Sequence, residues 1–178
     1  IADATILLSS NEGWGLALTE SMLTGTPFIA NVTGGMQDQM RFVDKKEQWF
    51  TPDAKVPSNH NKTYTSHGEW VFPVYPSNKS IVGSPVTPYI WDDRCTPEDA
   101  AEQLEELYNL GSEQRIEVGR KGLEWATGPE AGFTSKIMGE RVIENIDKLF
   151  KTWKPREKYE LILTGDQGKK VINHELVY

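Results

Sequence analysis

Short apolar runs alternate with turn-forming residues over about the first forty residues. Residues 4–8 (ATILL) form a continuous apolar run, which predicts a strand buried on both faces of a parallel sheet. Residues 16–24 show an apolar-rich pattern that predicts a buried helix, and a glycine and a proline follow it closely. Residues 28–32 predict the next strand, and residues 36–42 predict a short helix after a double glycine. This order predicts an α/β fold with parallel strands joined by right-handed crossovers.

From residue 44 to residue 67 the hydrophobic pattern stops. Polar residues, proline and histidine dominate this stretch, and its apolar anchors are Trp49, Phe50, Val56 and Tyr64. A loop of this length is uncommon in a compact domain unless it is functional or partly disordered, so we interpret it as an insertion. Residues 69–74 return to strand character. Residues 75–88 indicate a connection rich in proline and serine, and residues 89–91 a very short strand.

The later part of the chain predicts helices. The sequence Thr96-Pro97-Glu98-Asp99 combines a threonine cap, a proline at the first position and acids in the first turn. Gly111 is expected to end that helix and Ser112 to cap the next one, in which the mainly inward residues are Ile116, Gly119, Leu123 and Trp125. A further amphipathic helix is predicted from Thr134 to Pro155. The pair Asp92-Asp93 indicates a turn.

Beyond these helices the pattern is weaker. Residues 159–163 and 170–176 indicate extended pieces around the turn Gly165-Asp166. We therefore expect one domain over residues 1–155 with an inserted loop at 44–67, followed by a C-terminal extension over residues 156–178.

The length, net charge and cysteine count of the chain exclude several classes of function. A chain of 178 residues has room for one domain with a proper core. Its net charge of −7 argues against nucleic-acid binding, although local amides and a helix end can still attract a small anion. The single cysteine, Cys95, excludes an internal disulfide and a multi-cysteine metal site, and it fits a cytoplasmic setting. His60, His67 and His174 lack ligand spacing and are expected at the surface.

The stretch from Ser9 to Glu20 carries the candidate chemistry. Glu12 precedes a turn with two glycines, and Glu20 lies eight residues later inside the predicted helix. A helix adds roughly 1.5 Å per residue, so the spacing allows the two carboxylates to be separated by the length of a diphosphate. The amides around Gly15, Leu16 and Ala17 would take a pyrophosphate at the positive end of the helix dipole. Each carboxylate would then accept hydrogen bonds from a pair of sugar hydroxyls.

These residues resemble a known family. Ser9 and the run Glu12-Gly13-Trp14-Gly15-Leu16, closed by Glu20 in an E-x7-E spacing, resemble retaining GT-B glycosyltransferases, particularly the GT4 group. Gly25-Thr26-Pro27 and the segment 31–36 (NVTGGM) resemble the next strand and double-glycine loop of that family. The resemblance implies a partial Rossmann-like parallel sheet, the C-terminal half of a GT-B fold, which binds a nucleotide-sugar donor.

The resemblance also implies roles for single residues. Glu12, the candidate catalytic residue, would contact the donor sugar, and Glu20 would contact the ribose. Amides near Gly13, Trp14, Gly15, Leu16 and Ala17 would hold the sugar and diphosphate, with Gly34 and Gly35 as a supporting loop. Such enzymes need neither metal nor cofactor and transfer the sugar with retention, by front-face attack within an ion pair. The acceptor stays unknown.

The chain departs from the family pattern at its start. The family has an acceptor domain and early strands bearing an arginine and a lysine that grip the diphosphate, and nothing here matches them. We expect that upstream sequence precedes Ile1 and that the isolated chain is inactive. Peripheral membrane association would come from the missing parts, and an exposed sheet edge would favour pairing between copies.

Two other functions stay open. A nucleotide-sugar epimerase shares the fold and would convert free donor without an acceptor. A non-catalytic ligand-binding or assembly module would fit the inserted loop and the missing strands.

Overall fold

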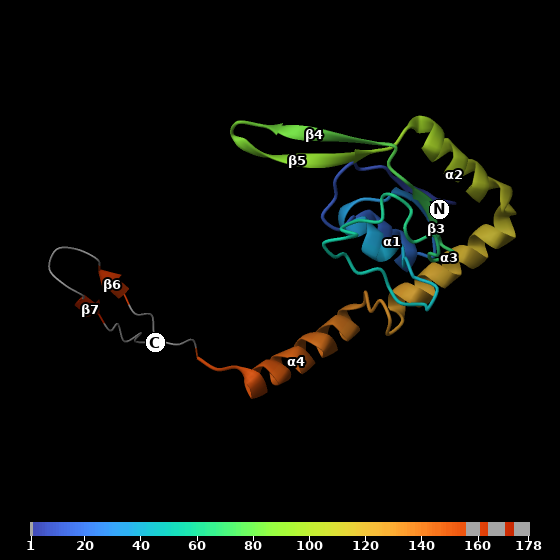
Figure 1. Cartoon of the computed structure of the whole chain (residues 1–178). Coiled ribbons are helices and arrows are strands. Elements are labelled where there is room, and N and C mark those ends of the chain that lie inside the picture. The colour runs from blue at the N-terminus through green and yellow to red at the C-terminus, as the bar shows by residue number, and fades with distance from the viewer. Residues whose placement is uncertain (1, 156–160, 164–169, 173–178) are drawn as a thin grey trace. The chain divides into compact units, whose positions relative to one another are not determined.

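The structure analysed is a computed structural model, which describes residues 2–155, 161–163 and 170–172 (Figure 1). The chain forms two compact units, Ile1–Met138 and Gly139–Tyr178.

A parallel sheet lies at the centre of the first unit. Its three strands lie in the order β1-β2-β3, and all pair in parallel; they are β1 (Thr5–Leu7), β2 (Phe28–Asn31) and β3 (Val71–Val74). In register, Ile6 lies beside Ile29 and Ile29 beside Phe72. This arrangement confirms the predicted α/β class and agrees with a partial Rossmann-like domain.

Side chains of β2 and β3 alternate between two hydrophobic clusters, one on each face of the sheet. Phe28 and Ala30 pack in a cluster with Leu18 of α1 (Leu16–Leu23) and Trp125 of α3 (Gly111–Thr127). Ile29, Phe72 and Val74 pack instead with Leu107 of α2 (Pro97–Asn109). Because both faces are covered, every residue of β2 and β3 is buried.

The expectation that β1 is buried on both faces is wrong. Ile6 keeps 49% of its surface exposed, and Leu8, just after the strand, is also exposed. Within the described residues β1 pairs only with β2, so its other edge has no neighbouring strand to cover it. An apolar run of five residues cannot by itself distinguish a central strand from an edge strand.

The segment after β2 differs in detail from the prediction. The short helix expected at 36–42 is a 3-10 helix, η1 (Gly34–Gln39), which begins at the double glycine. The segment 44–67 contains no helix or strand, only isolated bridges from Val43 to Trp49 and Ser66. Two of its anchors, Phe50 and Tyr64, contact each other with ring centroids 5.0 Å apart.

The connection predicted at 75–88 and the turn predicted at Asp92-Asp93 are wrong. Residues 78–94 form an antiparallel hairpin of β4 (Asn78–Ser84) and β5 (Thr87–Arg94), whose tip projects outward from the body of the first unit in Figure 1. The prolines explain the error. Pro85 lies at the tip, and Pro88 lies at a bulge where two residues face Gly83, so neither needs an N–H for the ladder.

Some of the predicted helix caps and inward-facing residues are confirmed, and others are wrong. Thr96 forms a complete capping box with Asp99 at the start of α2, as predicted. Ser112 does not cap α3, because the helix already begins at Gly111 and Leu110 occupies the cap position. The prediction that Ile116 is inward is also wrong, since it is exposed. Gly119 and Trp125 are buried as expected, and a Cβ on Gly119 would lie only 2.0 Å from the Gly25 carbonyl oxygen.

The predicted last helix is α4 (Ser135–Thr152), which buries none of its residues although it is strongly amphipathic. Two short strands, β6 (Leu161–Leu163) and β7 (Lys170–Ile172), pair antiparallel and confirm part of the predicted extended pieces. The turn Gly165-Asp166, the rest of those pieces and His174 lie outside the described residues. Among the described residues, no helix has both the length and the apolar character needed to cross a membrane.

Candidate functional site

The candidate site lies at the carboxyl ends of β1 and β2. The loop from Leu8 to Trp14 leaves β1 and leads into α1, while the loop Val32–Thr33 leaves β2 and leads into η1. Ligands of open parallel α/β sheets bind beyond these strand ends, where the loops of neighbouring strands meet. The predicted motif and the predicted double glycine are therefore on the same edge.

Gly15 turns the chain from this loop into α1. It is the cap residue of the helix, in the left-handed conformation with φ of 81°, and no side chain caps the helix. A Cβ here would lie 2.9 Å from Cγ of Met36, so both the backbone angle and the space require glycine. Leu16 and Ala17 follow with exposed side chains. The first-turn amides of α1 are consequently open to an anion.

The double glycine packs directly against the backbone of the motif. The Gly35 N–H donates to the Glu12 carbonyl oxygen at 3.1 Å. A Cβ on Gly34 would lie 2.0 Å from the Glu12 carbonyl oxygen, and one on Gly35 would lie 2.1 Å from the Gly13 carbonyl oxygen. Any side chain at either position would push the two loops apart. The structure thus brings together the two motifs that the sequence predicted separately.

The two predicted carboxylates are available to a ligand. Glu12 is half-buried in the loop, and Glu20 is exposed on α1. In the part of the chain that the structure describes, neither carboxylate makes a hydrogen bond or an ion pair. Gly13, between the two, has nothing within 4 Å of a Cβ position, so space is open above it.

Trp14 has a supporting position. Its ring contacts Phe133 edge-on, with centroids 5.4 Å apart, and its Nε1–H donates to Oγ1 of Thr19 at 2.9 Å. The side chain is therefore engaged in packing and hydrogen bonding beneath the turn, and only its backbone remains for a ligand.

Gln39 is a supporting residue that the sequence did not reveal. It is fully buried, and its Nε2 donates to the carbonyl oxygens of Trp14 and Gly15. The Thr19 hydroxyl donates to Oε1 of Gln39 at 2.7 Å, which completes the network. A glutamine at the end of a short helix has no sequence signature for this role, because its partners lie on another loop.

Asp93 of β5 joins the hairpin to the same strand ends. It is buried, and Thr33 Oγ1 donates to its Oδ2 at 2.8 Å, while Lys79 Nζ lies 3.3 Å from its Oδ1. Nδ2 of Asn31 donates to the Asp93 carbonyl oxygen at 2.8 Å and to the Ser9 carbonyl oxygen at 3.1 Å. The contacts of Thr33 and Asn31 with Asp93 span 60 and 62 residues of sequence, so no local pattern predicts them.

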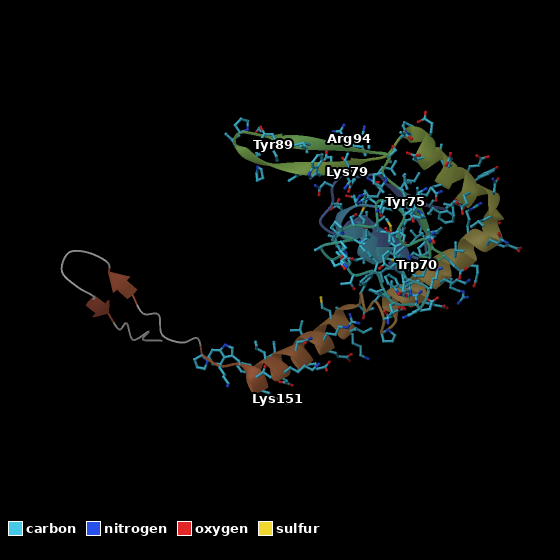
Figure 2. All side chains as sticks on the ribbon, in the orientation of Figure 1. Trp70, Tyr75, Lys79, Tyr89, Arg94 and Lys151 are labelled. Carbon is cyan, nitrogen blue, oxygen red and sulfur yellow. The ribbon has the colours of Figure 1, made fainter. Side chains whose placement is uncertain are left out.

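A separate cavity of about 510 Å³ lies between the segment 60–67, the end of β3 and α2. Its wall carries imidazole, ammonium and carboxylate groups, including His60, His67, Lys62 and Glu106, but none of the predicted site residues. Tyr75, which Figure 2 labels, also lines this cavity. Lys62 Nζ lies 4.8 Å from the ring centroid of Tyr75, and burial raises the pKa of Tyr75 to about 12. Its mixed charge indicates no particular ligand.

The described residues contain no cluster of three or more histidine, cysteine, aspartate or glutamate side chains with metal-binding geometry. Cys95, just before α2, is half-buried, and that burial raises the pKa of its thiol. A thiol with a raised pKa carries less of the reactive thiolate, so Cys95 is expected to be unreactive.

The fold and the site together define a partial α/β domain with a glycine turn and an uncapped helix N-terminus at one sheet edge. Residues 1–54 match the family model described as glycosyl transferases group 1, so this segment is similar to part of a domain of that family. The matched segment contains the whole E-x7-E motif and the double glycine. No curated protein and no solved structure matches the chain.

Proposed function

We propose that this chain supplies part of the nucleotide-sugar site of a glycosyltransferase, which transfers the sugar to an acceptor with retention. One observation carries the proposal most directly. The Gly34-Gly35 backbone packs against the Glu12-Gly13 backbone, beside the uncapped first turn of α1, all within the segment that matches the family. A cluster of open amides between two free carboxylates suits a diphosphate with a hydroxyl-rich group at each end.

Different residues of the site bind different parts of the donor. The amides of Leu16 and Ala17 bind the diphosphate, where the helix dipole provides about half a positive charge. Glu20, on the exposed side of α1, accepts hydrogen bonds from the ribose hydroxyls. Glu12, half-buried in the loop, accepts hydrogen bonds from the hydroxyls of the sugar and orients it. Glu12 is thus the proposed catalytic residue through contact with the sugar, without acting as a nucleophile.

The sugar is transferred while the donor is bound in this way. The bond between the sugar carbon C1 and the phosphate oxygen breaks, and the acceptor oxygen attacks C1 from the same face. The acceptor proton passes to the leaving phosphate oxygen, so charge and atoms balance without a protein base. Amides and the helix dipole stabilise the diphosphate as its negative charge increases, and no metal ion is part of the proposal.

Calorimetric titration with UDP, GDP and their sugars tests the donor site. We expect the chain to bind one of these ligands, and Glu20→Ala to weaken binding by about tenfold or more, because a hydrogen bond to a charged group contributes about 1.5–3 kcal/mol. Glu113→Ala is the matched control, since Glu113 is an exposed acid in the first turn of α3. The affinity should be the same in the presence of EDTA.

Two results would contradict the proposal. One is the absence of binding for every nucleotide and nucleotide sugar, which would favour a non-catalytic module. The other is equal loss of affinity in Glu20→Ala and Glu113→Ala, which would show that charge alone, and not the position of Glu20, matters.

A further inference from the structure

The hairpin of β4 and β5 is fixed at its base to the candidate donor site. The Asp93 N–H donates to the Ser10 carbonyl oxygen at 2.9 Å, and Ser10 lies two residues before Glu12. The Asp93 carboxylate accepts from Thr33, which precedes the double glycine. The hairpin therefore begins at the rim of the site and has a defined direction there. Figure 2 labels Tyr89 toward its tip and Lys79 and Arg94 nearer its base.

One face of this hairpin carries its aromatic side chains. Successive residues of a strand point to opposite faces, so Tyr89, Trp91 and Asp93 share a face. Ile81 pairs with Trp91 in register and belongs to the same face. A Cβ on Gly83 would lie 3.0 Å from Cδ1 of Tyr89, which places the Tyr89 ring over that glycine. We call the surface made by Ile81, Tyr89 and Trp91 the aromatic face.

The aromatic face continues outward from the site. Asp93, at the base of the same side of the hairpin, accepts a hydrogen bond through its carboxylate from Thr33 at the end of β2. The side chains farther out on the same face, beyond the body of the unit, are open to solvent, with exposed fractions of 57% for Ile81, 64% for Tyr89 and 61% for Trp91. Asn11 of the donor loop contacts β5 here, because its Nδ2 donates to the Trp91 carbonyl oxygen at 3.5 Å.

We propose that the aromatic face binds an uncharged sugar ring of the acceptor, an inference that rests on the proposed function. A pyranose presents polarised C–H groups on one side, and these are attracted to the negative face of an indole or phenol ring. Tyrosine and tryptophan lose little conformational entropy on binding, because each has two side-chain torsions. The only charged groups on this hairpin face, Lys79 and Asp93, already pair with each other at 3.3 Å. The exposed surface is therefore neutral.

Other occupants fit less well. A stable interface between two protein chains buries roughly 800 Å² on each partner, which is more than three side chains provide. An anionic membrane surface would be repelled by the net charge of −7. A sugar ring next to Asn11 would also lie beside the donor loop, where transfer requires the acceptor to be.

The test uses an array of uncharged oligosaccharides and the full 178-residue chain. We expect the chain to bind at least one glycan, and titration of that glycan with Trp91→Ala to give an affinity about tenfold lower, as for loss of one stacked ring. Tyr89→Ala should act in the same direction. Ile90→Ala is the matched control, because Ile90 is exposed on the opposite face of β5, and its affinity should stay within about twofold of the parent.

Three outcomes would overturn the proposal: no glycan bound by the parent chain, equal affinity for parent and Trp91→Ala, or concentration-dependent self-association that Trp91→Ala abolishes. Nucleotide-sugar titration of Trp91→Ala separates this proposal from the donor site. Donor binding without glycan binding rejects the aromatic face alone. Glycan binding that depends on Trp91 without any donor binding rejects the proposed donor site and leaves a sugar-binding surface.

Discussion

At the scale of single residues, glycine decides how closely the two loops of the site approach. Gly34 and Gly35 touch the backbone of Glu12 and Gly13 at distances that leave no room for a Cβ. Gly15 adds a left-handed turn with φ of 81°, which few other residues adopt without strain. Three positions without side chains therefore set how closely the two loops pack and how the chain turns into α1.

The first prediction concerns Gly35→Ala. The new Cβ would lie 2.1 Å from the Gly13 carbonyl oxygen, so the loops must separate, and we expect a loss of about 1–3 kcal/mol in the free energy of unfolding. Denaturant titration measures this loss. Gly139→Ala is the matched control, because nothing lies within 4 Å of its Cβ position and alanine favours a helix by about 0.5–1 kcal/mol. A variant Gly35→Ala as stable as the parent would contradict the close contact.

The sequence predicted some residues of the site and missed others for a physical reason. Glu12, Gly15 and Glu20 lie within one short stretch, where spacing alone suggests a diphosphate ligand. Gln39 and Asp93 act through tertiary contacts, and the partner of Asp93, Thr33, is sixty residues away. Which buried polar groups meet depends on packing, and packing leaves no local pattern.

At the scale of elements, the capping signal at Thr96 was reliable, whereas the cap predicted at Ser112 and the connection predicted around the prolines were wrong. The Thr96–Asp99 capping box depends only on residues three positions apart, so its prediction needs no tertiary information. The hairpin was missed because Pro85 and Pro88 suggested a loop, while the bulge that accommodates Pro88 appears only in the paired structure.

The second prediction concerns this capping box. Thr96→Ala removes the hydroxyl that accepts from the Asp99 N–H at 3.2 Å, and we expect a loss of about 1 kcal/mol in the free energy of unfolding. Ser112→Ala is the matched control, because Ser112 lies inside α3 and no side-chain cap forms there. Equal effects of the two substitutions in thermal or denaturant unfolding would contradict the assignment.

The same cap gives stability a pH dependence. The hydrogen bond from the Thr96 backbone N–H, followed by that from its hydroxyl, lowers the pKa of Asp99 below its ordinary value. A carboxyl group with a lowered pKa stabilises the fold above its unfolded pKa, and this contribution disappears as the pH falls through the folded pKa. The difference in Tm between the parent and Asp99→Asn should therefore be larger at about pH 6 and should shrink as the pH falls below about 4, toward and through the lowered pKa of Asp99.

At the scale of the whole molecule, the α/β class and the parallel pairing were predictable, and the exposure of β1 was not. Continuous apolar runs and glycine turns gave the order of strands and helices in the matched segment. The same runs contain no information about which strand lies at the edge. Ile6 consequently presents an apolar side chain on an unpaired edge of the described sheet.

The third prediction is that this edge promotes association between copies of the chain. An open, apolar strand edge is a template for pairing, and a lysine there disfavours it. We expect the mean mass in sedimentation experiments to rise with concentration for the parent and to rise less for Ile6→Lys. Ile116→Lys, which changes an exposed apolar residue of a helix, is the matched control and should behave as the parent. A parent chain that stays monomeric over the whole concentration range would contradict the prediction.

The contact between the double glycine and the motif also restricts how such a chain can diverge. Because the carbonyl oxygens of Glu12 and Gly13 occupy the space where side chains of residues 34 and 35 would lie, the two loops cannot change independently. A descendant that gained a side chain at position 34 or 35 would need a compensating deletion or reshaping between Glu12 and Gly15. The lengths of these two loops should therefore be inherited as a pair, even where the strands that carry them drift in sequence.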